Sequence, residues 1–172
     1  MKRLAIVLVG VLLAAGCSSS NSSSPSTTNP NQIRFTAALS PSQETPPITN
    51  AESVGSGSVT IDMTLTRDAT NAISAATVNF QANMQGFPST TIVNIAHIHQ
   101  GAAGVAGPIL VNTTVNPGEV VLTSGVGTFT RTSISVSPTT AQEIIDNPAG
   151  FYFNIHTTLN PGGVMRGQLV KQ

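Results

Sequence analysis

The sequence predicts an all-β domain, an antiparallel Greek-key sandwich or barrel that carries one short helix. Thr, Ser, Val, Ile, Asn and Gly dominate the chain after residue 31, and β-branched and turn-forming residues of this kind favour strands over helices. Apolar and polar residues alternate in many short runs, which Pro, Gly and Asn separate. Many short strands with frequent turns are typical of sandwiches and barrels.

The chain begins with the layout of a bacterial lipoprotein signal. Lys2 and Arg3 give a positive start, and the apolar run from Leu4 to Ala15 is too short for a spanning helix, which needs about 20 residues. The segment Leu13-Ala14-Ala15-Gly16-Cys17 resembles the lipobox. We therefore predict a signal peptide over residues 1–16 and a diacylglycerol group on Cys17, which would anchor the protein in a lipid bilayer. An ordinary secretory signal with an incidental cysteine is the alternative.

Residues 17–31 follow as a predicted disordered tether that starts at the lipidated cysteine. Ser, Asn, Thr and Pro make up this segment after Cys17, and none of them can contribute to a hydrophobic core. Ser18, rather than Asp, follows the cysteine, which indicates the outer membrane if the host is Gram-negative. We expect a lipid-anchored protein of the cell envelope whose domain, residues 32–172, lies just outside the membrane.

The strands are expected in runs that are bounded by turn residues. In chain order they are Ile33–Leu39, Gly57–Thr66, Ala72–Phe80, Thr91–His99, Pro108–Thr114, Glu119–Thr123, Gly127–Ser133, Phe151–Thr157 and Val164–Val170. The helix is expected near 138–146, because Ser137 can cap it and Pro138 suits its first position. Asn147 and Pro148 then end it.

Four motifs in a fixed order resemble the CHRD domain, a module first described in chordin and found in many bacterial secreted proteins. They are Phe35–Ser40 leading into Gln43-Glu44-Thr45-Pro46-Pro47, Ala96-His97-Ile98-His99 with the loop 101–107, Phe151–Thr157, and Asn160–Gly163 with Arg166-Gly167-Gln168-Leu169. The resemblance covers nearly all of residues 33–170 and implies the fold and the exported location. It implies neither a ligand nor a catalytic activity. The chain departs from the family at Val164, where a Glu is usual.

The histidines are the candidate metal ligands. His97 and His99 share one face of a strand because residues two apart point the same way, and a His-x-His pair can aim two imidazoles at one metal. We place Val93 on that same face. Alternation places His156 on the same face as Tyr152 and Asn154, and it places Phe151, Phe153 and Ile155 on the core face. His156 could then join the pair if the two strands are neighbours and a bulge turns it inward. Copper or zinc would suit such a site, although the sequence by itself calls for no cofactor.

A structural interpretation of the histidines stays open beside the metal site. Neutral imidazole offers one donor and one acceptor, which suits the pinning of a glycine-rich loop such as 101–107. Glu44 lies in a stiff segment before two prolines and is expected to pair with Arg34 or Arg166. Arg166 is expected to hydrogen-bond a loop carboxylate or carbonyl group, and both residues are candidates for structural or ligand contacts.

Composition excludes several function classes. Charged residues make up 8% of the chain and the formal net charge is zero, so no basic cluster is available for nucleic acid. No catalytic residue is assigned, because the chain has no nucleophile elbow and no phosphate loop. The sequence thus favours a binding or structural module, with an unknown protein or small-molecule ligand, over an enzyme. The alternative is a copper- or zinc-binding sandwich with a redox or metal-handling role.

Overall fold

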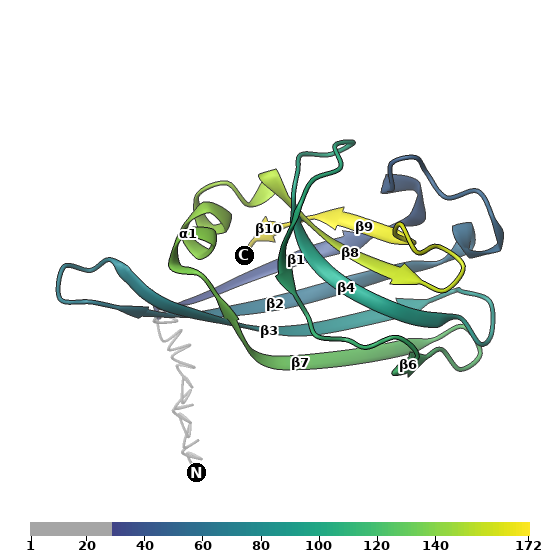
Figure 1. The fold of residues 1–172 in the computed structure, drawn as a ribbon, viewed down its shortest axis with the longest axis horizontal. Helices are drawn as coiled ribbons and strands as arrows, with labels where there is room; N and C mark the ends of the chain where they lie inside the picture. The colour runs from purple at the N-terminus through teal and green to yellow at the C-terminus, as the bar shows by residue number, and fades with distance from the viewer. Residues whose placement is uncertain (1–28) are drawn as a thin grey trace, which may run out of the picture.

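The computed structural model describes residues 29–172 and shows two antiparallel β-sheets packed face to face (Figure 1). Sheet A has the strand order β10-β1-β2-β3-β7, and sheet B has the order β5-β4-β8-β9 with β6 beside β4. The strands are β1 (Gln32–Leu39), β2 (Ser56–Arg67), β3 (Ile73–Gln85), β4 (Ile92–Gln100), β5 (Ile109–Asn112), β6 (Val120–Val121), β7 (Gly127–Val136), β8 (Phe151–Thr157), β9 (Met165–Gln168) and β10 (Val170–Lys171). The predicted signal peptide, Cys17 and most of the predicted tether lie outside the described residues.

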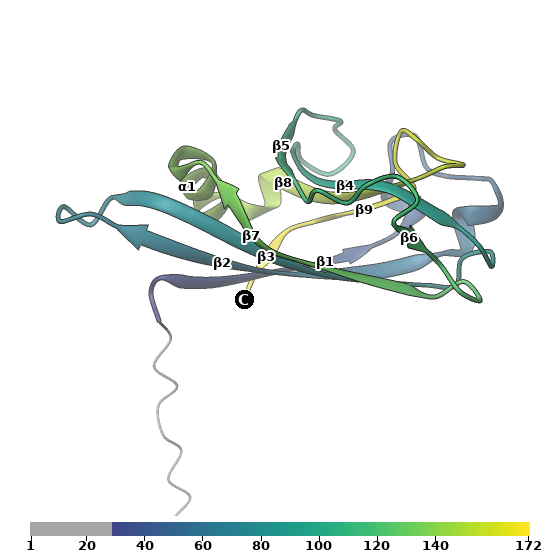
Figure 2. The same ribbon diagram turned by 60° about the horizontal axis from the view of Figure 1, so that its bottom comes forward.

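The core fills the space between the two sheets, which Figure 2 shows as separate layers. Alternate side chains of each strand point into it, because successive residues of a strand face opposite sides of the sheet. Phe80 of sheet A contacts Phe153 of sheet B, with their ring centroids 5.7 Å apart, and both are fully buried. Aliphatic residues from both sheets complete the core, as the scarcity of aromatic residues requires.

The all-β prediction is confirmed, and of the two alternatives the sandwich is correct and the closed barrel is wrong. The predicted helix is present as α1 (Pro138–Asp146), and the Ser137 side chain accepts a hydrogen bond from the Thr140 amide at 3.1 Å. Short 3-10 helices, which the sequence analysis did not predict, lie at Pro41–Gln43, Ala51–Val54 and Pro148–Gly150.

Several strand boundaries differ from the prediction for identifiable reasons. Strand β3 does not end at Phe80 but continues to Gln85, because β2 pairs with it as far as Ser56. The runs predicted at 108–114 and 119–123 shorten to β5 and β6. The single strand predicted at 164–170 is two strands, because the chain passes from sheet B to sheet A at Leu169, whose side chain is buried in the core.

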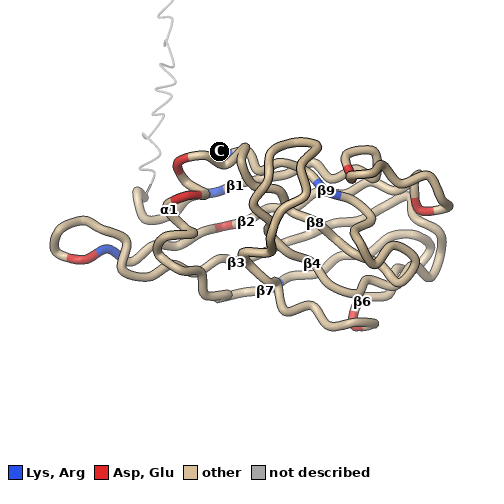
Figure 3. The backbone as a smooth tube through the Cα atoms, turned by 45° about the horizontal axis from the view of Figure 1, so that its top comes forward, with Lys and Arg blue, Asp and Glu red and all other residues tan. Residues whose placement is uncertain are grey.

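The central strands of sheet B position the site that is described next. Strands β4 and β8 are antiparallel neighbours, with His97 opposite Asn154 and Ile95 opposite His156. Charged residues are sparse along the backbone, as Figure 3 shows. Within residues 29–172, no helix has both the length and the apolar character that crossing a membrane would require.

Candidate metal centre

The three histidines of the chain meet on the outer face of sheet B, the face turned away from sheet A. His97 and His99 come from β4 and His156 comes from β8. One ring nitrogen from each lies within 4.8 Å of the other two. The side chains are 2%, 8% and 7% exposed, respectively, so the cluster is buried although it stands outside the core between the sheets.

Simple alternation along β4 and β8 brings the histidines to this face. Ala96 and Ile98 on β4, like Phe153 and Ile155 on β8, point into the core, so the residues between them point outward. The two strands are neighbours, as the metal site requires, and His156 needs no bulge to join the pair. The irregularity of this strand pair lies instead between Val93 and Ile95. It sends Val93 into the core, where it is fully buried, rather than to the histidine face.

Hydrogen bonds to backbone carbonyls set the tautomers of two of the rings. His99 Nδ1 lies 3.0 Å from the Gly107 carbonyl oxygen, and His156 Nδ1 lies 2.9 Å from that of Pro161. Because a carbonyl can only accept, both Nδ1 atoms carry the proton and each Nε2 keeps a free lone pair. This second hydrogen bond is what metal-binding histidines typically make, since it fixes the ring and its tautomer.

Three buried ring nitrogens are left without partners. His99 Nε2, His156 Nε2 and His97 Nδ1 are buried and make no hydrogen bond. A buried polar atom without a partner costs about 1–3 kcal/mol. His99 fits the loop-pinning interpretation, because its partner Gly107 closes the loop 101–107. His97 does not fit it, since its buried Nδ1 holds nothing in place.

All three imidazoles are neutral near pH 7. Burial, together with the smaller effects of the neighbouring His156 and His99, lowers the pKa of His97 to about 4. Burial also lowers the pKa values of His99 and His156, against the opposing effect of their carbonyl hydrogen bonds. Metal ligation requires the neutral form of imidazole, so the protein holds these rings in the state that binds a metal.

The spacing of the nitrogens fits a metal ion after a small adjustment. Zinc–nitrogen bonds of about 2.0–2.1 Å place the ligand nitrogens of a tetrahedral site about 3.4 Å apart. The farthest pair here is at most 4.8 Å apart, so the nitrogens would have to approach one another by up to about 1.4 Å to share one ion. An all-imidazole set suits copper and zinc among the common protein metals.

A stacked column adjoins the cluster on the same face. The Arg166 guanidinium carbon lies 3.4 Å from the centroid of the Tyr152 ring, and that ring is parallel to His99 within 6° at 4.8 Å. Arg166 also donates hydrogen bonds of 3.1 Å to the carbonyl oxygens of Ala102 and Val105. The column holds the loop 101–107 over the sheet and supports His99 from one side.

Glu44 lies in the same layer, next to Asn154. Arg34 pairs with Asp62 at 2.6 Å, so it is not the partner of Glu44. Glu44 Oε1 instead accepts a hydrogen bond of 2.7 Å from Asn154 Nδ2. Burial raises the pKa of Glu44 to about 7, while the positive charge of Arg166 and the bond from Asn154 act in the opposite direction.

A buried carboxylate that the sequence analysis missed fixes the loop beside His156. Glu52 is 3% exposed, and its Oε2 accepts hydrogen bonds from Thr157 Oγ1 at 2.6 Å and from Asn160 Nδ2 at 2.5 Å. These bonds hold the turn that carries Pro161, the partner of His156. The sequence gives no signal for this role, because Glu52 is an isolated acidic residue in a short 3-10 helix. By contrast, alternation along β8 correctly placed Tyr152 and Asn154 on the face of His156.

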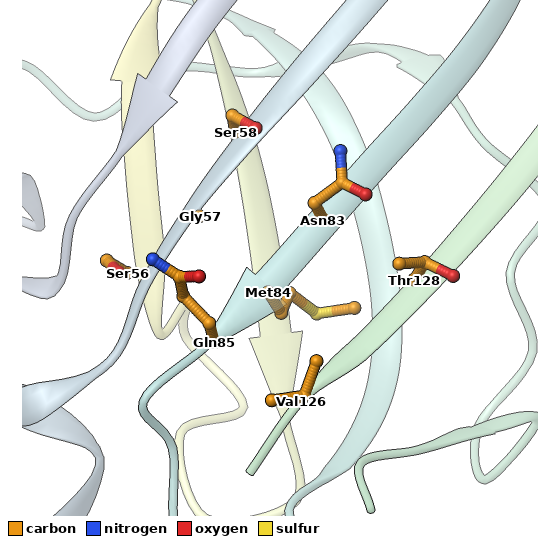
Figure 4. A pocket seen from close by; sticks show the side chains of 8 residues that line it. All are labelled: Ser56, Gly57, Ser58, Asn83, Met84, Gln85, Val126 and Thr128. Carbon is orange, nitrogen blue, oxygen red and sulfur yellow. The ribbon is translucent and has the colours of Figure 1, made fainter.

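A cavity of about 390 Å³ lies on sheet A, away from the histidines. Figure 4 shows its lining from β2, β3 and the start of β7: Ser56, Gly57, Ser58, Asn83, Met84, Gln85, Val126 and Thr128. None of these side chains is titratable near neutral pH. The cavity therefore offers hydrogen bonds but no group for acid–base or metal chemistry.

Comparison with known proteins gives one match. A family model described as the CHRD domain matches residues 35–169. No curated protein and no solved structure matches the chain. Val164, which stands where the family usually has Glu, is fully buried in the hydrophobic cluster.

Proposed function

The chain belongs to the CHRD domain family, and on this premise we propose that it is an envelope lipoprotein whose CHRD domain binds a copper or zinc ion. The family supplies a β-sandwich module with an unknown ligand. His97, His99 and His156 supply the ligand set. The predicted lipid on Cys17 supplies the location.

One observation carries the metal proposal. Three imidazole nitrogens are buried close together without a protein partner, and two of them, His99 Nε2 and His156 Nε2, carry free lone pairs. Histidines that serve only as structural pins normally use their buried nitrogens, because each orphaned atom lowers stability. A metal ion would satisfy all three nitrogens at once and would account for the cost that the metal-free protein bears.

The donor set favours copper over the other metals. Imidazole sites generally bind Cu²⁺ more tightly than other divalent first-row metals, and Zn²⁺ is the next most common partner of such sites. Three protein ligands leave further coordination positions for an exchangeable group, as in metal sites that handle or transform ligands rather than only hold the fold together. A metal-handling or redox role in the envelope follows from this arrangement.

Calorimetric titration of the full-length chain in detergent, after removal of metals with a chelator, tests the proposal. We expect one equivalent of Cu²⁺ or Zn²⁺ to bind in the wild type. The triple variant His97→Ala, His99→Ala, His156→Ala should lose this binding, because no ligand nitrogen remains. Equal heats for the two proteins would contradict the proposal and leave the histidines a structural role.

The lipid anchor is proposed on independent grounds. The lipobox-like segment ends at Cys17, which is the only cysteine of the chain, and small residues precede it as they do at cleavage sites. We expect cells that express the protein to incorporate labelled palmitate into it. A Cys17→Ala variant should lose the label, and a label that persists in this variant would contradict the anchor.

A further inference from the structure

The unsatisfied polar atoms of the domain are concentrated at one place. Across residues 29–172, the buried side-chain nitrogen and oxygen atoms without a hydrogen-bond partner are His97 Nδ1, His99 Nε2, His156 Nε2 and Asn154 Oδ1. Three of them belong to the histidines that are the candidate ligands of the metal. The fourth, an amide oxygen, has no place in the ligand set described above, and it requires a separate explanation.

Asn154 is the neighbour of His97 across the strand pair. The two residues are directly opposite in the register of β4 and β8, where side chains on one face have Cβ atoms about 4.5–5.5 Å apart. Asn154 is 3% exposed, so solvent does not satisfy its oxygen. Its carbonyl oxygen can only accept a hydrogen bond. The missing partner must therefore be a donor.

A hydrogen bond to Glu44 fixes the orientation of the Asn154 amide. Asn154 Nδ2 donates to Glu44 Oε1 at 2.7 Å, which assigns the nitrogen to the Glu44 side and leaves the oxygen free. Gly163 allows this contact, because a Cβ at that position would lie 2.7 Å from Asn154 Nδ2 and 2.8 Å from Glu44 Oε1. Glu44 and Gly163 thus hold the amide in one orientation.

We propose that Asn154 Oδ1 accepts a hydrogen bond from a small protic ligand, such as water, which occupies an exchangeable coordination position of the three-histidine metal centre. This inference rests on the proposed metal function. It adds the class of exogenous ligand: a small molecule that donates a hydrogen bond. It also assigns Asn154 and Glu44 as positioning residues that do not touch the metal.

A cavity lies on the Glu44 side of the Asn154 amide. A cavity of about 330 Å³ opens between the segment from Glu44 to Asn50 and the turn from Leu159 to Gly163. This turn also contains Pro161, whose carbonyl oxygen is the partner of His156. Because the lining includes Glu44, which accepts the hydrogen bond of the Asn154 amide, a small ligand that enters this cavity reaches the neighbourhood of Asn154.

Azide binding to the full-length chain loaded with one equivalent of Cu²⁺ tests the inference, with the charge-transfer absorption of the copper–azide complex as the readout. Azide carries no proton, so it displaces the protic ligand without replacing its bond to Asn154. In Asn154→Leu that bond is already absent, and the azide dissociation constant should fall about fivefold, the equivalent of about 1 kcal/mol for one hydrogen bond. The affinity for Cu²⁺ itself should change less than threefold.

Asn112→Leu is the matched control. Asn112 faces His97 from the other neighbouring strand, but its Oδ1 already accepts a hydrogen bond from the Thr114 amide at 2.7 Å. The azide affinity of the copper-loaded Asn112→Leu variant should equal that of the wild type. If Asn154→Leu does not fold, Glu44→Leu replaces it, because the freed amide can turn its NH₂ group toward azide and tighten binding in the same direction.

The outcomes separate this inference from the metal function on which it rests. Absence of Cu²⁺ binding in the calorimetric titration removes the metal centre itself. If Cu²⁺ binds but azide gives no charge-transfer band, the exchangeable position is overturned while the metal centre stands. If azide binds the wild type and Asn154→Leu with the same affinity, the role of Asn154 is overturned while the metal centre stands. Weaker azide binding in Asn154→Leu would show that the amide donates to the ligand, which also overturns the assignment.

Discussion

Replacement of His97 by leucine should stabilise the metal-free protein while it removes most of the affinity for metal. The buried Nδ1 of His97 has no partner, and leucine fills a similar volume without a polar atom. We expect the free energy of unfolding without metal to rise by about 1 kcal/mol. Loss of one of three ligands should weaken Cu²⁺ or Zn²⁺ binding at least about 100-fold, since even groups that only support a ligand contribute 10- to 100-fold.

His99→Leu is the control for this experiment. His99 differs from His97 because its Nδ1 donates to the Gly107 carbonyl, so the leucine variant leaves that carbonyl without its partner. This variant should lose about 1–2 kcal/mol of stability without metal, and it should lose metal affinity as well. Urea unfolding in the presence of a chelator measures both variants. A His97→Leu variant that is less stable than the wild type by 2 kcal/mol would assign His97 a structural role.

The stability of the metal-free protein should depend on pH through two opposing groups. His97 has a pKa of about 4 in the folded protein, whereas a histidine without such interactions has a pKa of 6.5. Between these values the unfolded chain binds more protons, so stability falls as the pH is lowered through this window. Glu44 has a pKa of about 7 when folded, against 4.5 otherwise. Here the folded chain binds more protons, so stability falls as the pH rises from 4.5 to 7.

Single substitutions separate the two contributions. In Glu44→Gln the opposing contribution of Glu44 is absent, and we expect His97 to make stability rise by about 2 kcal/mol between pH 4.5 and 7. In His97→Leu only His99 and His156 still oppose Glu44, and the slope should be smaller than in the wild type. The wild type should lie between the two variants. Urea unfolding at a series of pH values with chelator present measures these slopes, and identical slopes in all three proteins would contradict the assignment.

Alternation of side chains was enough to predict the faces of the strands that carry the site. It placed His97 with His99 and grouped His156 with Asn154, because side chains of a strand alternate regardless of what covers the sheet. It could not reveal that the outer face of sheet B is buried. That burial comes from the loops 101–107 and 158–163, whose positions depend on contacts such as Arg166 with Ala102 and Glu52 with Asn160.

The sequence alone could not predict that the three imidazole rings converge, for a similar reason. His99 is opposite Tyr152 in the register, and His156 is opposite Ile95, so their backbones are well separated along the strands. The rings nevertheless come within 6.2 Å, because both lean over His97 and are held there by the carbonyl groups of Gly107 and Pro161. Such inclination is set by tertiary hydrogen bonds. The link between Glu44 and Asn154, which are 110 positions apart, likewise has no local signature.

Because the chain passes from sheet B to sheet A at Leu169, sheet A is completed only by the end of the chain. The last strand, β10, pairs with the first, so that Phe35 is opposite Lys171. Pairing of segments so distant in sequence delays folding, because the intervening chain must be ordered before the contact forms. During synthesis, the first strand emerges long before this partner. Sheet A therefore reaches its full width only after residue 171 has left the ribosome, and a chain that is exported while still being extended would cross the membrane before its fold is complete.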